Sequence, residues 1–289
     1  MSVIFNWKPD DDQIYISDYG SQTQLGSGVD FNKYNGRFFI MDARDCTLTL
    51  KATENTSPNF TSWPDKRSGF GYGSHPEIIV RQGAFQIIGL SQFNCGSYGD
   101  PIYPDFVNIS VSDSGHFTVG SQFVYFSSLK KDSVDQPKVT VTENGKFDVD
   151  ADYIFASSGW IDAADNAVVN FTALQFFAEF ASGLPTLTLL PRFTLGAGSP
   201  VFNFIGTSPD VTIVDFMNET YQEGLFNFKS DSKGKFVFKG IGNAFQQTAM
   251  LSYKLIAVDG ITDPAYVKKK LNMNMTDSFV NGDLVVQLK

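Results

Sequence analysis

Three aspartates stand at alternate positions in one short stretch, and this spacing could support chemistry. Asp148, Asp150 and Asp152 are separated by Val149 and Ala151. Successive side chains of a β-strand point to opposite faces, so the three carboxylates would project together into solvent. Clustered carboxylates can hold Ca²⁺ or act as acid and base on a glycosidic bond. The stretch is therefore a candidate catalytic or calcium site.

A solvated outer face accounts for the same three residues. Charges on such a face block unwanted edge pairing. We find no Arg or Lys in the same predicted strand to complete a lyase site, and three carboxylates repel one another without a cation. Asp113 and Asp162 could lie nearby. The solvated face is the favoured interpretation, and catalysis or calcium binding is the alternative.

Aromatic residues in turn-rich segments are the second group of candidates. Tyr98, Tyr103 and Trp160 lie beside Gly and Pro residues, where flat rings can stack on sugars or anchor a protein partner. Packing against the body of the fold is the alternative. We predict these three as binding residues.

The remaining reactive side chains are few. His116 occupies the turn position that Lys146 holds in a related copy, so we expect it to be exposed at a corner, and His75 lies in a loop. Cys46 and Cys95 lack the paired spacing of a zinc site, and we expect buried thiols, with one disulfide as the alternative. No phosphate-binding loop or nucleophile elbow is present, so no cofactor is predicted.

A repeat must position these residues. Segments 107–119 and 137–149 align without a gap, since 145 minus 115 and 147 minus 117 both give 30. The shared pattern has two alternating apolar positions, a short turn with Gly115 or Gly145, then Phe-x-aliphatic. Less regular copies occupy 78–87, 169–176, 187–196 and 226–238. If the copies stack in parallel, the residues Phe85, Phe117, Phe147, Phe193 and Phe236 form an internal column about 4.8 Å apart.

Two architectures satisfy this alternation. Glu143-Asn144-Gly145-Lys146 is a strong hairpin signal, which favours an antiparallel β-sandwich or hairpin array. Recurrence of Phe-x-aliphatic at one place in each copy instead favours stacked coils. A third strand-like piece at 123–126, 153–155 and 201–205 gives three faces per coil. We therefore predict an all-β fold, a right-handed parallel β-helix, with the antiparallel array as the alternative.

Segment 139–149 resembles the coils of parallel β-helix proteins, such as bacterial adhesin and autotransporter passenger domains and polysaccharide lyases. The resemblance covers about residues 76 to 240 and is one of pattern, with Phe in place of the usual small aliphatic residue at the stacked position. It implies that an aspartate-bearing parallel face would be the place for any lyase or hydrolase activity.

The pattern also divides the chain. Residues 1–75 are predicted to be an irregular, β-rich N-terminal cap region, and 76–240 the solenoid repeats. Residues 241–289 are predicted to be a C-terminal cap. In this cap Asp263 would begin a short helix with Pro264 in its first turn, and a final strand would occupy 282–288.

Composition limits the function. The chain has 289 residues, with 28 Phe and 11 Tyr against 18% charged residues, which favours strands. A formal net charge of -9 argues against nucleic acid as a partner. No apolar run of about 18 residues predicts a membrane span. The first residues lack a signal-peptide pattern, so we expect a cytoplasmic protein or one exported without a cleaved signal.

These observations favour a non-enzymatic protein that binds a protein or glycan partner through its flank and loops. The alternatives are a polysaccharide lyase or glycoside hydrolase using Asp148, Asp150 and Asp152, and a structural component of a phage tail or surface fibre, for which a homotrimer would be expected.

Overall fold

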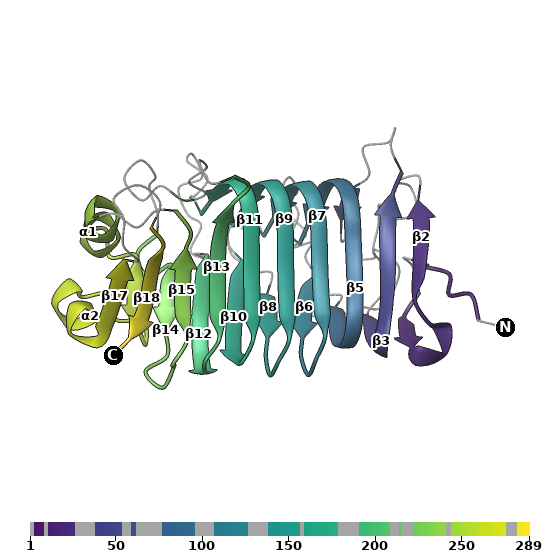
Figure 1. Cartoon of the computed structure of the whole chain (residues 1–289), viewed down its shortest axis with the longest axis horizontal. Helices are drawn as coiled ribbons and strands as arrows, with labels where there is room; N and C mark the ends of the chain where they lie inside the picture. The colour runs from purple at the N-terminus through teal and green to yellow at the C-terminus, as the bar shows by residue number, and fades with distance from the viewer. Residues whose placement is uncertain are drawn as a thin grey trace, which may run out of the picture.

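The computed structural model describes residues 3–8, 11–26, 38–53, 59–61, 77–95, 107–126, 138–156, 159–178, 191–208, 214, 222–240, 244–275 and 282–289. Most of them lie in strands that stack side by side into an elongated, mostly parallel arrangement (Figure 1), with the two termini at opposite ends. The predicted all-β fold is confirmed, and the parallel stacking is compatible with a solenoid. No helix in the described part is both long and apolar enough to span a bilayer.

The first face of the stack is entirely parallel. Its strands, in order along the stack, are β1 (Gln13–Ile16), the start of β3 (Phe38–Ala52), the start of β5 (Glu77–Asn94), β6 (Asn108–Val111), β8 (Lys138–Val141), β10 (Trp160–Asp165), β12 (Arg192–Gly198), β14 (Phe226–Phe228) and β16 (Ile256–Val258). Each of these strands comes from the coil that follows in the sequence, so successive coils stack on one another.

The second face has the same parallel order until its last strands. It consists of β2 (Gln22–Gly26), the later parts of β3 and β5, then β7 (His116–Tyr125), β9 (Lys146–Phe155), β11 (Val168–Phe177), β13 (Val201–Gly206) and β15 (Lys235–Phe238). The antiparallel strands β18 (Leu284–Leu288) and β17 (Leu271–Met275) follow β15.

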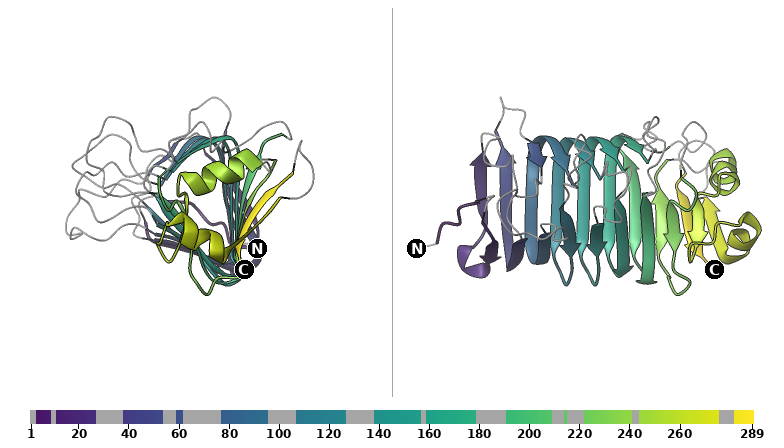
Figure 2. Two further views of the ribbon diagram at one scale, coloured as in Figure 1. Left: turned by 90° about the vertical axis from the view of Figure 1, so that its left-hand side faces the viewer. Right: turned by 180° about the vertical axis from the view of Figure 1, so that it is seen from behind.

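The third face is made by β4 (Asn59–Thr61) and the ends of β5, β7, β9 and β11. The long ribbons of these strands curve over one edge of the stack in Figure 1, and the view along the stack in Figure 2 shows strands surrounding a common interior. Pairing of β7 with β9 across 123–125 confirms the predicted third piece. The prediction that segment 201–205 belongs to this third face is wrong, because β13 pairs with β11 on the second face.

Alternation of apolar and polar residues explains the interior. Phe85, Phe117 and Phe147 are completely buried and pair in register from coil to coil. Their ring centroids are 5.3 and 5.6 Å apart with nearly parallel planes. Phe236 continues the same column through two intervening strands. The predicted aromatic column is thus confirmed at these four positions.

Phe193 does not belong to that column. It lies on the first face, between Ile161 of the preceding coil and Phe226 of the next, and Phe202 holds the second-face position instead. Both faces carry the same apolar-x-apolar pattern, so the sequence alone left the frame of the copy at 187–196 ambiguous. The predicted copy at 169–176 has the same error. Its first residues correspond to the first face in the repeat pattern, but in the structure they lie on the second face.

The corner between the first and second faces explains the hairpin signal. β8 and β9 flank the corner but pair with neighbouring coils rather than with each other. Glu143 has a left-handed φ of 58°, and Gly145 N donates to Thr142 O at 2.9 Å. A Cβ on Gly145 would lie only 2.8 Å from Val111 O in the coil below. Glycine here permits close approach of successive coils.

The N-terminal end is covered by segment 3–8. Phe5 packs edge-on against Tyr15 at 4.9 Å, and Trp7 against Phe39 at 5.2 Å, so both rings cover the apolar cross-section. A short 3₁₀ helix, η1 (Ser17–Tyr19), lies between β1 and β2. Since β3 already pairs with β5 over both faces, the stacked coils begin before the boundary predicted at residue 76.

The C-terminal end carries two helices, α1 (Ala244–Ser252) and α2 (Pro264–Lys270). Asp263 caps α2 by accepting a hydrogen bond from Tyr266 N at 2.8 Å, and Pro264 occupies its first turn, as predicted. The final strand is also confirmed as β18. β16 still stacks on β14, so this region combines a last coil with a cap.

Candidate functional site

The three predicted aspartates lie on β9 but do not form one cluster. Asp148 and Asp150 face outward on the second face, where they pair with β7 and β11. Asp152 falls at the bend toward the third face, where the pairing with β7 passes from Ala151 to Tyr153. Among the described residues no group of three His, Cys, Asp or Glu side chains is arranged to hold a metal ion.

Asp148 has three partners instead. His116 Nε2 lies 2.7 Å and Lys146 Nζ 2.8 Å from its Oδ2 atom, and Asn170 Nδ2 donates to Oδ1 at 2.7 Å. Lys146 belongs to β9 itself, so the expectation that this strand lacks a basic residue was wrong. His116 is half-buried at the start of β7 rather than exposed at a corner, and it also lies 3.2 Å from Thr118 Oγ1.

The surroundings of Asp148 keep it ionised. Burial acts to raise the pKa of this carboxyl, but hydrogen bonds from His116, Lys146 and Asn170, with the attraction of His116, outweigh burial and hold the pKa below its ordinary 3.8. A general acid must carry a proton near the working pH. Asp148 is therefore poorly suited to protonate a leaving group, and its oxygens are already engaged by donors.

The hydrogen-bonded row continues along the second face. Asn203 Nδ2 donates to Asn170 Oδ1 at 2.7 Å. Thr49 Oγ1, three coils before Asp148, donates at 3.1 Å to Oε1 of Gln86, which is two coils before Asp148. These residues occupy equivalent outward positions in successive coils. Such a row satisfies polar groups across the sheet and stabilises it.

Asp113 and Asp162 lie away from this row. Asp113 is in the corner turn before β7 and accepts from Gln82 Nε2 at 2.7 Å. Asp162 is on the first face, with Lys138 Nζ at 3.7 Å. The prediction that they could join the aspartates of β9 is not met by these positions.

Trp160 is the one predicted binding residue that the structure describes. It begins β10 on the first face, half-buried, with the Arg192 guanidinium 4.5 Å from its ring centroid. Tyr98, Tyr103 and His75 lie outside the described residues. Cys46 and Cys95 are free thiols, and burial raises the pKa of Cys95.

An aromatic group that the sequence analysis did not propose as a site lies on the third face. We call it the aromatic strip, and it consists of Phe123, Tyr125, Tyr153, Phe155 and Phe177. All five side chains are half-buried and point outward, whereas Val124, Ile154 and Phe176 between them are buried. The strip therefore presents an apolar surface over three coils.

The rings of the aromatic strip stack on one another in the direction in which the coils stack. Phe123 and Tyr153 are 5.5 Å apart at 13°, and Tyr125 and Phe155 are 4.9 Å apart at 8°. Phe177 lies 4.8 Å from Phe155 at 9°. Because neighbouring rings cover each other's faces, the strip exposes mainly ring edges.

Polar residues adjoin the strip in the coil before it and within its last strand. In the preceding coil Gln92 and Asn94 hold the positions of Phe123 and Tyr125, and Gln92 Nε2 donates to Asn94 Oδ1 at 2.9 Å. In β11, the last strand of the strip, Gln175 holds the position that Phe123 and Tyr153 hold in the two preceding coils. The apolar surface thus has a polar margin, as protein-binding patches do.

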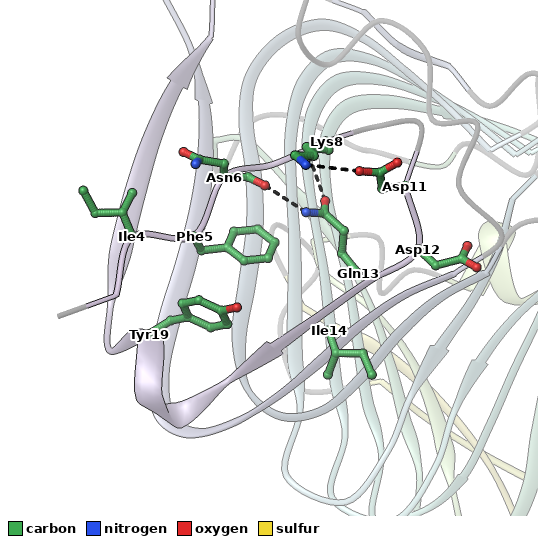
Figure 3. Close-up of a pocket in the computed structure, with 9 residues that line it drawn as sticks. All are labelled: Ile4, Phe5, Asn6, Lys8, Asp11, Asp12, Gln13, Ile14 and Tyr19. Atoms are coloured by element: carbon green, nitrogen blue, oxygen red, sulfur yellow. Dashed lines mark hydrogen bonds and ion pairs between the residues drawn. The ribbon is translucent and has the colours of Figure 1, made fainter.

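A hollow of about 380 Å³ opens at the N-terminal end (Figure 3). It is lined by Ile4, Phe5, Asn6, Lys8, Asp11, Asp12, Gln13, Ile14 and Tyr19. Lys8 Nζ lies 3.4 Å from Asp11 Oδ2, and Gln13 Nε2 donates to Asn6 O at 2.8 Å. Charged groups at its edge distinguish it from the aromatic strip.

Comparison of the chain with protein-family models, curated proteins and solved structures finds no match.

Proposed function

We propose that this protein is a non-enzymatic binding protein, built on a right-handed parallel β-solenoid, which recognises a polypeptide partner through the aromatic strip. Parallel strands joined by crossovers in one sheet are nearly always right-handed, which supports the handedness. The observation that carries the proposal is the outward exposure of five aromatic side chains in neighbouring coils.

Ring geometry favours a polypeptide over a glycan. Sugars stack on the faces of aromatic rings, and in the aromatic strip the faces that point toward a neighbouring coil of the strip are covered by its rings. Exposed ring edges and the tyrosine hydroxyl groups of Tyr125 and Tyr153 suit apolar side chains and backbone groups of a protein.

The enzymatic alternative has less support. Asp148 is ionised and engaged by three donors, and Asp150 and Asp152 do not join it in a cluster. A structural role in a phage tail or surface fibre stays a prediction, which the geometry of the aromatic strip does not test.

A random-peptide display library and a glycan array, both presented to the wild-type protein, test the proposal. We expect enrichment of peptides with apolar residues, and at least about tenfold weaker binding of these peptides by Phe155→Ala. Trp160→Ala removes an aromatic side chain from the first face and serves as the matched control, with unchanged peptide binding. Circular dichroism confirms that both variants are folded.

Two results would contradict the proposal. Glycan binding without peptide enrichment would replace the polypeptide by a sugar as the partner. Equal loss of peptide binding in Trp160→Ala and no loss in Phe155→Ala would move the site to the first face.

A further inference from the structure

Exposed apolar side chains gather at the two ends of the stack. Among the described residues, eight of the nine large hydrophobic side chains that are exposed lie in the terminal elements, and Leu174 is the exception. At the N-terminal end they are Val3, Ile4, Ile14, Ile16 and Leu25, and at the C-terminal end Phe245, Tyr253 and Ile261. Ile4 is 75% and Phe245 74% exposed, and apolar side chains that gather on one surface are typical of contact sites.

Exposed groups of opposite charge occur at the two ends, next to Lys8 at the N-terminal end and to Asp259 and Asp263 at the C-terminal end. At the N-terminal end Asp11 and Asp18 are exposed, and Asp12 lines the hollow shown in Figure 3. At the C-terminal end Lys268, Lys269 and Lys270 are all exposed in the last turn of α2. Figure 1 places these elements at opposite extremes of the molecule. The lysines of α2 in one copy are therefore complementary to the exposed aspartates at the N-terminal end of another.

We infer that the protein associates head to tail with further copies of itself, the lysine-bearing C-terminal end of one molecule docking on the aspartate-bearing N-terminal end of the next. The occupant is a second copy because both complementary surfaces, apolar and charged, are found on the same chain. A contact between two different surfaces does not close on itself and generates a linear series.

Strand edges support the same arrangement. β2 pairs with β3, and β17 pairs with β18, while the other edge of each five-residue strand has no strand partner among the described residues. Both belong to the second face, at its two ends (Figure 1). Unpaired edges are the usual templates for strand addition from another chain. Head-to-tail docking would bring these two edges toward each other.

The N-terminal cap determines which of its surfaces can contact another copy. Gln22 and Gln24 point toward the interior, where the next coil has Leu48 and Leu50. Their Oε1 atoms accept from Phe5 N at 3.1 Å and Trp7 N at 2.9 Å. The interior is thus covered at this end. The contact between copies therefore involves the outer surface of the cap, where the exposed carboxylate of Asp18 can receive a lysine side chain.

Sedimentation velocity over a concentration series tests the inference with two double variants. Asp11→Lys with Asp18→Lys makes both ends basic, and Lys268→Glu with Lys269→Glu makes both ends acidic. The experiment is done at an ionic strength of about 0.1 M, where screening over about 10 Å leaves mainly the facing charges to interact. Lys229→Glu with Lys233→Glu, two exposed lysines between β14 and β15, is the charge-matched control.

We expect the weight-average mass of the wild type and of the control to rise with concentration through dimers and longer species. Each end variant alone should stay monomeric, because like charges face each other. An equimolar mixture of the two end variants should recover the association, since every junction is again complementary. A wild type that is monomeric throughout, a closed trimer insensitive to the end variants, or a mixture that fails to associate would overturn the inference.

Discussion

Replacement of Asp148 by Asn tests the role of the polar row on the second face. The wild-type carboxylate accepts from Asn170 at 2.7 Å and contacts His116 and Lys146. The contacts of Asp148 with Lys146 and His116 are partly exposed, so each contributes about 0.5 kcal/mol or less. The hydrogen bond from Asn170 to a charged acceptor adds about 1.5 kcal/mol. An amide of the same shape turns an NH₂ group toward donors, and we expect a loss of about 1 to 2 kcal/mol in the free energy of unfolding.

The effect should depend on pH. The pKa of Asp148 is lowered in the folded protein, so its ionised form stabilises the fold above about pH 5, and this contribution is lost as the pH falls through the folded pKa. The stability difference between wild type and Asp148→Asn should therefore be largest at neutral pH and should shrink below about pH 4. Urea denaturation at several pH values measures this stability difference. The slope of the unfolding free energy against urea concentration shows whether the compactness of the two proteins is the same.

Asp150→Asn is the matched control. Asp150 lies on the same strand and the same face, is exposed, and makes no hydrogen bond or ion pair among the described residues. Its amide variant should stay within about 0.5 kcal/mol of wild type. Equal effects at the two positions, or a difference for Asp148→Asn that persists unchanged at about pH 2, would refute the role given to this network.

Two further substitutions test the corners and the cap. Gly115→Ala should lower the free energy of unfolding by about 1 to 3 kcal/mol, because its Cβ would lie 2.2 Å from Val80 O. Gly120→Ala should cost less, since its nearest contact is the side chain of Ile88 at 3.1 Å. Equal urea midpoints for the two variants would argue against close approach of coils. Asp263→Ala should weaken α2 by about 1 kcal/mol, because Tyr266 N loses its 2.8 Å acceptor, and unchanged amide exchange in α2 would contradict this.

Coil stacking could be predicted because Phe117 and Phe147 recur with the same neighbours and the same turn. Alternation then fixes which side chains enter the interior. The frame of the later copies could not be predicted, since Phe193 on the first face and Phe202 on the second have the same apolar-x-apolar context. Only the pairing of strands distinguishes the two faces.

The partners of Asp148 were hidden for a related reason. His116 precedes it by 32 residues and Asn170 follows it by 22, so these contacts depend on the length of each coil. The repeat offset of 30 does align His116 with Lys146. A parallel register built on that offset would have placed His116 one coil away from Asp148, and this was the available signal.

The aromatic strip required one more fact, the bend after Ser121. Strict alternation from Phe117 would turn Phe123 and Tyr125 inward. At the bend the chain leaves the second face, and the burial pattern shifts by one residue, so that Val124 becomes buried and its aromatic neighbours face outward. The shift recurs in the next coil, which is why rings from two coils stack on the outside. A bend of the backbone, rather than composition, thus converts residues that would extend the core into a surface available to a partner.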